Sequence, residues 1–373
     1  MIKFGLAGFG PNARVHLLEI GLVPGLHRRL RLAAGFDPDP AATAALKRKN
    51  IAVAGSFDEL LASDGIQAVL LSSPPKFHAG QAVAALEAGL HVYSEVPMAI
   101  DRQDIERIID AENGNPKAKY QLGENYCFMA EVLYAGRLAS SGRIGPVVCC
   151  DSEYLHDVTY RWREAKKGGP EEAPVHSWYS DFDPLAYGHA IGPAQAAMGG
   201  IEHPEPFIEV QSYANSIGDQ PDTPICAPAE AYHVALFRTR SSAIARCSAA
   251  FVFAREPARR WLTLTGATGS FECLHPGGAS RLFVAHDHVV TAMHHRAGRA
   301  SRLGQLALGR ASSIQLPGLA GGDARIMLDW LGAIEHDHKA SLHATVGGNM
   351  CLAGIAASEA ARSGAPVAIS VFE

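Results

Sequence analysis

Gly8-Phe9-Gly10-Pro11-Asn12-Ala13 is the stretch of sequence that decides the fold. It follows the apolar run Ile2–Ala7 and opens a segment of helical periodicity, so it fits the pattern G-x-G-x-x-G/A at a strand-to-helix turn. In this pattern the first glycine makes the turn, the second lets the backbone approach a pyrophosphate, and the small Ala13 lets the helix pack on the strand. The stretch predicts a dinucleotide site at a helix N-terminus, and the alternative is a glycine turn in an α/β domain without a ligand.

Asp37 ends the second apolar run, 24 residues beyond Ala13. The dinucleotide pattern has an acidic residue about 20 residues further on, whose carboxylate accepts a hydrogen bond from the ribose 2′-OH and repels a 2′-phosphate. We therefore expect NAD as the cofactor rather than NADP. Arg28, Arg29 and Arg31 come too early in the chain to count clearly against this preference.

The first third of the chain alternates short apolar runs with helical periods. Gly89 is expected as the C-cap of one helix and Asp101 as the N-cap of the next. This alternation predicts an α/β domain over residues 1–125, with a doubly wound parallel sheet covered by helices on both faces. The expected strands are Ile2–Ala7, Leu30–Phe36, Ala68–Ser72, His91–Tyr93 and Lys119–Leu122. The expected helices are Ala13–Leu22, Pro40–Lys49, Lys76–Ala88 and Asp101–Ala111.

After about residue 142 the pattern changes to short strands joined by turns, which predicts an α+β domain over residues 126–373 with a large, mostly antiparallel sheet. A Gly/Pro/Lys/Glu-rich loop is expected at Lys166–Pro174. One face of an open sheet packs on helices and the other needs cover, so we expect a homodimer or homotetramer. The expected strands are Val147–His156, Phe207–Ser216, Tyr232–Arg238, Ala243–Phe253 and Trp261–Thr265, and the expected helices are Asp323–Ile334 and Asn349–Ser363.

Composition excludes several classes of protein. The 373 residues are 47% hydrophobic and 19% charged, which supports a large core and rules out global disorder. A net charge of -5 leaves no basic excess for nucleic acid, and no apolar run reaches the roughly 18 residues of a membrane span. Because no signal peptide precedes Ile2 and the 7 cysteines are scattered, we expect a cytoplasmic protein without a disulfide framework.

Histidines at positions 286 and 288, 294 and 295, and 336 and 338 invite a metal interpretation. Residues two apart on a helix point about 200° apart, which makes a poor chelate. No matched cysteine or carboxylate spacing supports zinc. We therefore expect surface histidines here, and no metal.

Two further stretches resemble the Gfo/Idh/MocA oxidoreductases, namely Ser72-Ser73-Pro74-Pro75-Lys76-Phe77-His78 and Ala88-Gly89-Leu90-His91-Val92-Tyr93-Ser94-Glu95-Val96-Pro97. That family pairs an N-terminal Rossmann domain with a C-terminal sheet domain that carries the substrate site. Its usual third motif is Glu-Lys-Pro, whose lysine assists proton transfer at the oxidised hydroxyl. Val96 stands in place of this lysine, and valine holds no proton.

The NAD-dependent α-N-acetylgalactosaminidases of glycoside hydrolase family 109 resemble this chain at the same point, with Glu-Val-Pro. One position departs from that branch: Ala186 lies three residues before His189, where the family pattern has tyrosine, and Tyr187 lies two before. Either Tyr187 serves from a shifted backbone or its role is lost. The other stretches that look alike are Gly123-Glu124-Asn125-Tyr126, Glu153-Tyr154-Leu155-His156-Asp157, Trp162-Arg163, Leu185–Pro193 and Gly321-Gly322-Asp323.

The resemblance implies roles for individual residues. His189 is the expected base at the C3 hydroxyl or at C2 of a sugar, and Tyr187 the donor or orienting hydroxyl; a buried histidine and a core aromatic are the alternatives. Glu95 would meet the nicotinamide-side ribose, and Asn125 the cofactor or sugar, since both follow strand ends. The expected cofactor residues are Gly8, Phe9, Gly10, Pro11, Asn12, Asp37, Ser73, His78, Glu95, Pro97 and Asn125. The expected substrate residues are Tyr126, His156, Arg161, Trp162, Arg163 and Trp178, some of which a solvated loop would also explain.

The resemblance also implies an enzyme that cleaves a glycosidic bond through transient oxidation. NAD takes hydride from C3, a base removes the C2 proton that the ketone acidifies, the C1 leaving group departs, and the hydride returns after water adds. The alternative is a net NAD-dependent dehydrogenase of a sugar or cyclic polyol. A third hypothesis is a cofactor-binding regulator without activity, because the lysine is missing at position 96.

Overall fold

The computed structural model describes residues 1–157, 183–215, 231–251, 259–273, 279–284, 289–294 and 321–373. The chain forms two compact units: Met1–Phe128 with Pro317–Gly348, and Met129–Leu316 with Asn349–Glu373. The sequence-based domains, divided between residues 125 and 126, differ from these units by three residues at the boundary and in one further segment. Residues 317–348 group with the first unit, because the pattern of a helix does not tell which sheet the helix covers. No helix among the described residues has the length and apolarity needed to cross a membrane.

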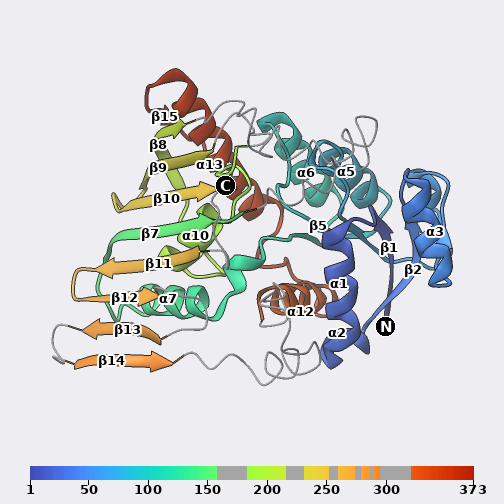
Figure 1. Ribbon diagram of the computed structural model, residues 1–373, viewed down its shortest axis with the longest axis horizontal. Coiled ribbons are helices and arrows are strands. Elements are labelled where there is room, and N and C mark those ends of the chain that lie inside the picture. The colour runs from blue at the N-terminus through green and yellow to red at the C-terminus, as the bar shows by residue number, and fades with distance from the viewer. Residues whose placement is uncertain (158–182, 216–230, 252–258, 274–278, 285–288, 295–320) are drawn as a thin grey trace, which may run out of the picture. The chain divides into compact units, whose positions relative to one another are not determined.

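The first unit is built on a six-stranded parallel sheet with the order β3-β2-β1-β4-β5-β6 (Figure 1). This is a doubly wound Rossmann sheet, as the sequence predicts, and its order reverses between β1 and β4. The strands are β1 (Ile2–Ala7), β2 (Leu30–Phe36), β3 (Ala52–Val53), β4 (Ala68–Leu71), β5 (His91–Ser94) and β6 (Tyr120–Leu122). The helices are α1 (Pro11–Leu22), α2 (Pro24–His27), α3 (Pro40–Arg48), α4 (Phe57–Leu61), α5 (His78–Glu87), α6 (Arg102–Gly114) and α12 (Gly322–Glu335), with the 3₁₀ helices η1 (Pro75–Phe77) and η2 (Asn125–Phe128).

Helix ends and strand burial agree with the local sequence signals. Asp101 is the N-cap of α6 and accepts a hydrogen bond from the Asp104 amide at 2.8 Å. Gly89 has φ +76° just beyond α5, as expected for a C-terminal glycine. All four residues of β4 are buried, because a central parallel strand is covered on both faces. The predicted helix Lys76–Ala88 instead begins as η1 and continues as α5, and β3, α2 and α4 were not predicted.

Helix α12 packs in the first unit although it lies near the end of the chain. Trp330 is 2% exposed, and its indole N–H donates to the carbonyl oxygen of Lys119 at 3.3 Å. The Trp330 and Tyr93 rings also form a T-shaped pair, with their centroids 5.7 Å apart. On the surface, Arg29 forms two hydrogen bonds to Glu335, at 2.8 and 2.6 Å. These contacts join α12 to the region of β2, β5 and β6, beside α1 and α2.

The second unit contains a mixed sheet, of which nine strands fall in the described ranges, ordered β14-β13-β12-β11-β7-β10-β9-β8-β15 (Figure 1). Only the β7–β10 pair is parallel among these, so the sheet is mostly antiparallel as predicted. The strands are β7 (Val147–Leu155), β8 (Phe207–Asn215), β9 (Tyr232–Thr239), β10 (Ile244–Ala250), β11 (Arg259–Gly266), β12 (Gly269–Cys273), β13 (Ala279–Val284), β14 (Val289–His294) and β15 (Val367–Ala368). The helices are α7 (Ala130–Ser140), α10 (Ile191–Gly199) and α13 (Ala344–Ser363), of which α7 and α10 were not predicted.

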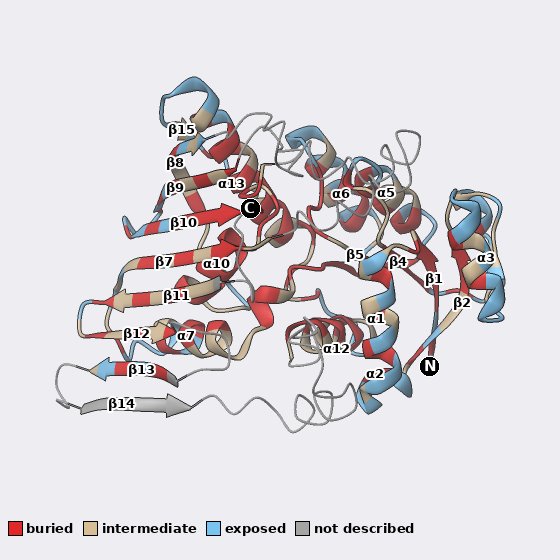
Figure 2. Ribbon diagram, in the orientation of Figure 1, coloured by how far each residue is buried: buried red, intermediate tan, exposed pale blue. Residues whose placement is uncertain are grey.

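One face of this second sheet is exposed (Figure 2). Side chains alternate along β8 to β10, so that Phe237 and Ala245 are buried while Leu236 and Ile244 are 52% and 42% exposed. Tyr213 on β8 is 66% exposed. The exposed face therefore carries large apolar side chains that no described residue covers.

Candidate active site

A sharp turn at Gly8 joins β1 to α1 at the point where the strand order reverses. Gly8 has φ +85°, and a Cβ atom on it would lie 2.5 Å from the carbonyl oxygen of Ser72, so only glycine fits. A Cβ on Gly10 would instead meet nothing within 4 Å. Ala13 is fully buried, which lets α1 pack closely. The open space at Gly10, beside the start of a helix, fits a pyrophosphate.

Asp37 follows β2 and holds the same turn in place. Its carboxylate accepts the Phe9 amide N–H at 2.7 Å and the Asp39 amide N–H at 2.8 Å. The Phe9 side chain is buried, with the Arg14 guanidinium 5.0 Å from the ring centroid. A half-buried carboxylate at this place fits a ribose with a free 2′-OH and opposes a 2′-phosphate.

His78 joins the loops that follow β4 and β5. It is 1% exposed, and its ring nitrogens lie 2.8 Å from the Pro97 carbonyl oxygen and 2.7 Å from the Ser73 carbonyl oxygen. Burial lowers the pKa of His78, although the two carbonyl groups favour the charged form. The Ser73 hydroxyl donates to Gln81 at 2.5 Å. His78 thus holds two loops of the expected cofactor site in position.

Glu95 follows β5 and contacts the Nε2 atom of His16 on α1. Burial disfavours a charged His16, but the Glu95 carboxylate outweighs it through its charge and hydrogen bond, and Asp323 adds to this, so the pKa of His16 is raised. Val96 donates its amide N–H to Glu95 at 3.3 Å, and its side chain is 4% exposed. The residue in the place of the family lysine is therefore buried and without a proton to exchange.

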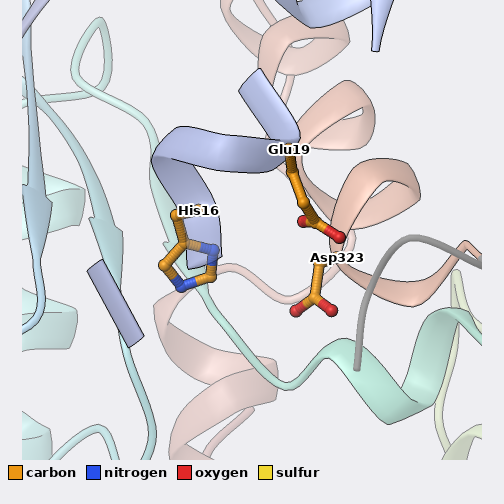
Figure 3. Close-up of side chains that lie close together, drawn as sticks. All are labelled: His16, Glu19 and Asp323. Atoms are coloured by element: carbon orange, nitrogen blue, oxygen red, sulfur yellow. The ribbon is translucent and has the colours of Figure 1, made fainter. Parts of the chain in front are cut away.

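Asn125 donates its side-chain N–H to Asp323 at 2.6 Å, and both are half-buried or buried. Beside Asp323 lies Glu19, which is 0% exposed, and burial, followed by the Asp323 charge, raises the pKa of Glu19 to about 9. Figure 3 shows His16, Glu19 and Asp323 converging from α1 and α12. Tyr126 is 8% exposed and so mostly enclosed.

The second unit brings two tyrosine rings against the imidazole of His189. The His189 ring lies 4.8 Å from the Tyr154 ring and 5.3 Å from the Tyr187 ring, edge to face in both cases. The Tyr154 hydroxyl is 2.9 Å from Nδ1 of His156. Phe251 lies 5.5 Å from Tyr187, ring to ring. His189, Tyr187 and His156 were predicted as site residues from the sequence, whereas Tyr154 was not.

Tyr187 and His189 meet through a turn rather than along an extended segment. Gly188 between them has φ +96°, a conformation that favours glycine. The Gly188 amide donates to Leu185 at 3.1 Å, and the Gly192 amide donates to Gly188 at 2.8 Å as α10 begins. Two residues this far apart would share a face in an extended segment, and here the turn at Gly188 brings the two rings together instead.

Asp183 holds the start of this turn through a hydrogen bond from the Leu185 amide. Its carboxylate lies 2.5 Å from Nδ1 of the fully buried His233, and accepts hydrogen bonds from the Ser358 hydroxyl at 2.5 Å and the Leu185 amide at 2.8 Å. Burial opposes ionisation, but the hydrogen bond and charge of His233 outweigh it, and the pKa of Asp183 is lowered. The aspartate joins the segment before Tyr187 to β9 and α13.

Some expected residues lie outside the described part of the chain, and others were missed. The substrate residues outside it are Arg161, Trp162, Arg163 and Trp178, and the loop Lys166–Pro174 lies outside it too. His16 and Glu19 were missed, although residues three apart share a helix face. Tyr154 lies on β7 and His156 just beyond its end, two residues apart in an extended segment, and that spacing was the available signal for their contact.

Residues 2–123 match the model of a family described as an oxidoreductase family with an NAD-binding Rossmann fold, the Gfo/Idh/MocA family. With the fitted turn at Gly8 and the carboxylate of Asp37, this part of the chain is an NAD-binding domain. Over these residues, about a third of the chain, the sequence is similar to the Gfo/Idh/MocA oxidoreductases.

Curated relatives resemble less than half of the chain. A 1-carboxy-3-chloro-3,4-dihydroxycyclo hexa-1,5-diene dehydrogenase of Comamonas testosteroni is 32% identical over 169 residues, which are 44% of this chain and 41% of that protein. A glycosyl hydrolase family 109 protein of Stenotrophomonas maltophilia is 27% identical over 176 residues, or 43% of this chain and 38% of that protein. The matched region thus spans less than half the length of these relatives.

Solved structures match the fold over nearly the whole chain. An oxidoreductase domain protein from Kribbella flavida has a TM-score of 0.77 at 18% identity and covers 99% of each chain. Levoglucosan dehydrogenase in complex with NADH has a TM-score of 0.76 at 18% identity and covers 100% of each chain. At this identity the likeness establishes the fold of this chain.

Replacing Asp37 by Ser is expected to shift cofactor preference. The variant loses the charge that opposes a 2′-phosphate, so the affinity for NADPH relative to NADH should rise about 10-fold or more. Fluorescence titration with both reduced cofactors measures the ratio. Asp110→Asn, at an exposed aspartate on α6, is the control and should leave the ratio unchanged. An unchanged ratio in Asp37→Ser would contradict this assignment.

Asp183→Asn is expected to destabilise the fold and to remove part of its acid sensitivity. Because folding lowers the pKa of Asp183, its stabilisation is present above the ordinary value of 3.8 and is lost as pH falls through the lower folded value. At neutral pH the variant should lose about 2 kcal/mol or more of unfolding free energy, since His233 keeps no charged partner there. Urea unfolding from neutral to acidic pH measures both effects. Glu202→Gln, at an exposed site, is the control, and equal acid slopes in wild type and Asp183→Asn would refute the prediction.

Proposed function

We propose that this chain is an NAD-dependent enzyme that cleaves a glycosidic bond in a sugar substrate through transient oxidation at C3. The observation that carries the proposal is the His189 imidazole held between Tyr154 and Tyr187, in a chain whose family lysine is replaced by the buried Val96. Relatives named as glycosyl hydrolase family 109 proteins support the proposal that the enzyme cleaves a glycosidic bond.

In this reaction NAD, when bound, accepts the C3 hydride and later gives it back. His189 takes the proton of the C3 hydroxyl while the hydride leaves C3 and the C3–H bond breaks. The C3 hydroxyl carbon thereby becomes a ketone. The C2 proton next to this ketone is acidic, and a base removes it while the C1–O bond breaks and the leaving group departs with the electron pair. Water then adds at C1, C2 regains a proton, and the product has the oxidation state of the substrate.

The side chains around His189 suit this work. Tyr187 is buried beside the imidazole and supplies a phenol that can orient a sugar hydroxyl or donate a proton. Tyr154 covers another edge of the ring and places its own hydroxyl on His156, so a second imidazole is near the first. Aromatic faces also pack against sugar rings, and the cluster therefore supplies stacking surface together with proton transfer.

A net NAD-dependent dehydrogenase of a sugar or cyclic polyol is the second candidate. The observation that favours it is Ala186 at the place of the family 109 tyrosine, together with a relative that is named a dehydrogenase and is 32% identical. In that reaction the first proton and hydride transfer occur and the oxidised product leaves. The two candidates differ in whether reduced cofactor accumulates.

His189→Ala is expected to abolish turnover and to retain NAD binding. A panel of aryl glycosides is scored for phenol release and for the absorbance of reduced nicotinamide, and wild type should release phenol without accumulating reduced cofactor. The variant should lose about 100-fold or more in kcat because the general base is gone. His203→Ala removes an exposed histidine of the same unit and should keep full activity.

Two results decide against the glycosidase. Stoichiometric NADH formation without bond cleavage would establish the dehydrogenase instead. Cleavage in D2O that leaves C2 of the product without deuterium would exclude the proton abstraction step. Wild-type turnover in His189→Ala would remove this residue from the mechanism altogether.

We also propose that the protein is a homo-oligomer and that the exposed sheet face of the second unit is its subunit interface. Leu236 lies opposite Gln211 and Arg246 in the middle of that face, and half of its surface is open. Leu236→Lys would bury an unpaired charge in such an interface and should raise the dissociation constant about 30-fold or more. Light scattering across a concentration series measures the change. Ile100→Lys, at an exposed apolar residue of the first unit, is the control, and a monomeric wild type would end the proposal.

A further inference from the structure

Three ionisable side chains that the proposed reaction does not use meet inside the first unit. His16 and Glu19 come from α1, and Asp323 comes from the start of α12 (Figure 3). Each offers a ligand atom, and these three atoms all lie within 4.8 Å of one another. All three residues are buried. The cluster joins two helices that are about 300 residues apart in the sequence.

Glu19 is the residue that most requires a partner. It is 0% exposed, and neither of its carboxylate oxygens has a hydrogen-bond partner among the described residues. Figure 3 shows the Glu19 carboxylate directed from α1 toward the Asp323 side chain. A buried carboxylate without a hydrogen bond is costly, and a second carboxylate beside it adds repulsion. A cation between the two oxygen atoms would remove both costs.

His16 has the arrangement of a histidine that binds a metal. Its Nε2 atom contacts the Glu95 carboxylate, and its Nδ1 atom is buried without a hydrogen-bond partner in the described part of the chain. Metal-binding histidines commonly donate one ring N–H to a carboxylate, which leaves the lone pair of the other nitrogen for the ion. Asp323 has a comparable support, because Asn125 donates to its Oδ1 atom at 2.6 Å.

We propose that His16, Glu19 and Asp323 bind one divalent first-row transition metal ion, such as Zn²⁺ or Mn²⁺. One imidazole nitrogen with two carboxylate oxygens suits these ions better than Ca²⁺ or Mg²⁺, which prefer sets of oxygen ligands. Ligand atoms around a tetrahedral Zn²⁺ lie about 3.4 Å apart, so separations of up to 4.8 Å need only a small contraction. The two carboxylates balance the charge of the ion.

The ion would have a structural role. Helix α1 begins at the cofactor turn and α12 returns from near the end of the chain, so a shared ion would fix one helix on the other. It would also hold His16, and through His16 the carboxylate of Glu95. This inference is independent of the proposed reaction, since neither a sugar nor His189 enters it.

The test measures metal binding by the full chain, with any histidine tag removed. The protein is stripped with a chelator, loaded with Co²⁺, freed of excess ion by gel filtration and assayed for cobalt by mass spectrometry and visible absorption. Wild type should retain about one ion per chain, and its melting temperature should rise by about 5 °C in excess Zn²⁺. Glu19→Gln and Asp323→Asn keep the shape of the side chains and should lose about nine-tenths of the bound metal.

Matched controls separate this site from surface binding. Glu87→Gln and His27→Gln replace exposed residues of the same unit and should bind cobalt like wild type. Wild type that retains no cobalt and shows no thermal shift would overturn the proposal. The three side chains would then bind protons and no metal ion. Metal that stays in Glu19→Gln, or that leaves with His27→Gln, would overturn it as well. The wild-type stoichiometry decides the question even where a variant does not fold.

Discussion

The close approach of Gly8 to Ser72 is the constraint on which the first unit depends. With a Cβ at 2.5 Å from a carbonyl oxygen, no other residue could hold β1 and β4 in their register while the chain turns into α1. Neighbouring loops are then fixed by side chains: Asp37 holds the Phe9 amide, and His78 holds the Ser73 carbonyl. The cofactor edge is thus assembled from backbone segments that a glycine turn and two buried or half-buried side chains hold in place.

Each unit contains a buried histidine–carboxylate pair, but the carboxylates around the two pairs differ in how many hydrogen-bond partners they have. In the second unit, Asp183 is matched by His233, Ser358 and a backbone amide, so its charge is well supported. In the first unit, Glu95 is matched by His16, whereas Glu19 adds a further carboxylate without a hydrogen bond from the described residues. Since a buried carboxyl group without hydrogen bonds is costly, this difference marks the His16 region as the place where an additional ion has most to contribute.

Local sequence signals predicted the first sheet because its central strands are buried on both faces and several of its helices begin at a capping side chain. The Asp101 N-cap and the apolar run of β4 are examples, since neither depends on distant residues. The position of α12 could not be predicted in this way, because Trp330 reaches Lys119 across more than 200 residues. The same holds for the site: the spacing of Tyr187 and His189 was visible, whereas the contact of Tyr154 with His189 depends on how β7 meets the turn before α10.

The replacement of lysine by Val96 changes what the proposed reaction requires of the second unit. A buried valine beside Glu95 can neither take nor return a proton, so the transfer has to be made by another group. A redox-neutral cycle moves a proton off the C3 hydroxyl and later puts one back, and an imidazole can do both because a ring nitrogen accepts a proton that it can return. The proposed reaction therefore needs a proton-transfer group other than the residue at position 96, and His189 is the residue proposed for it.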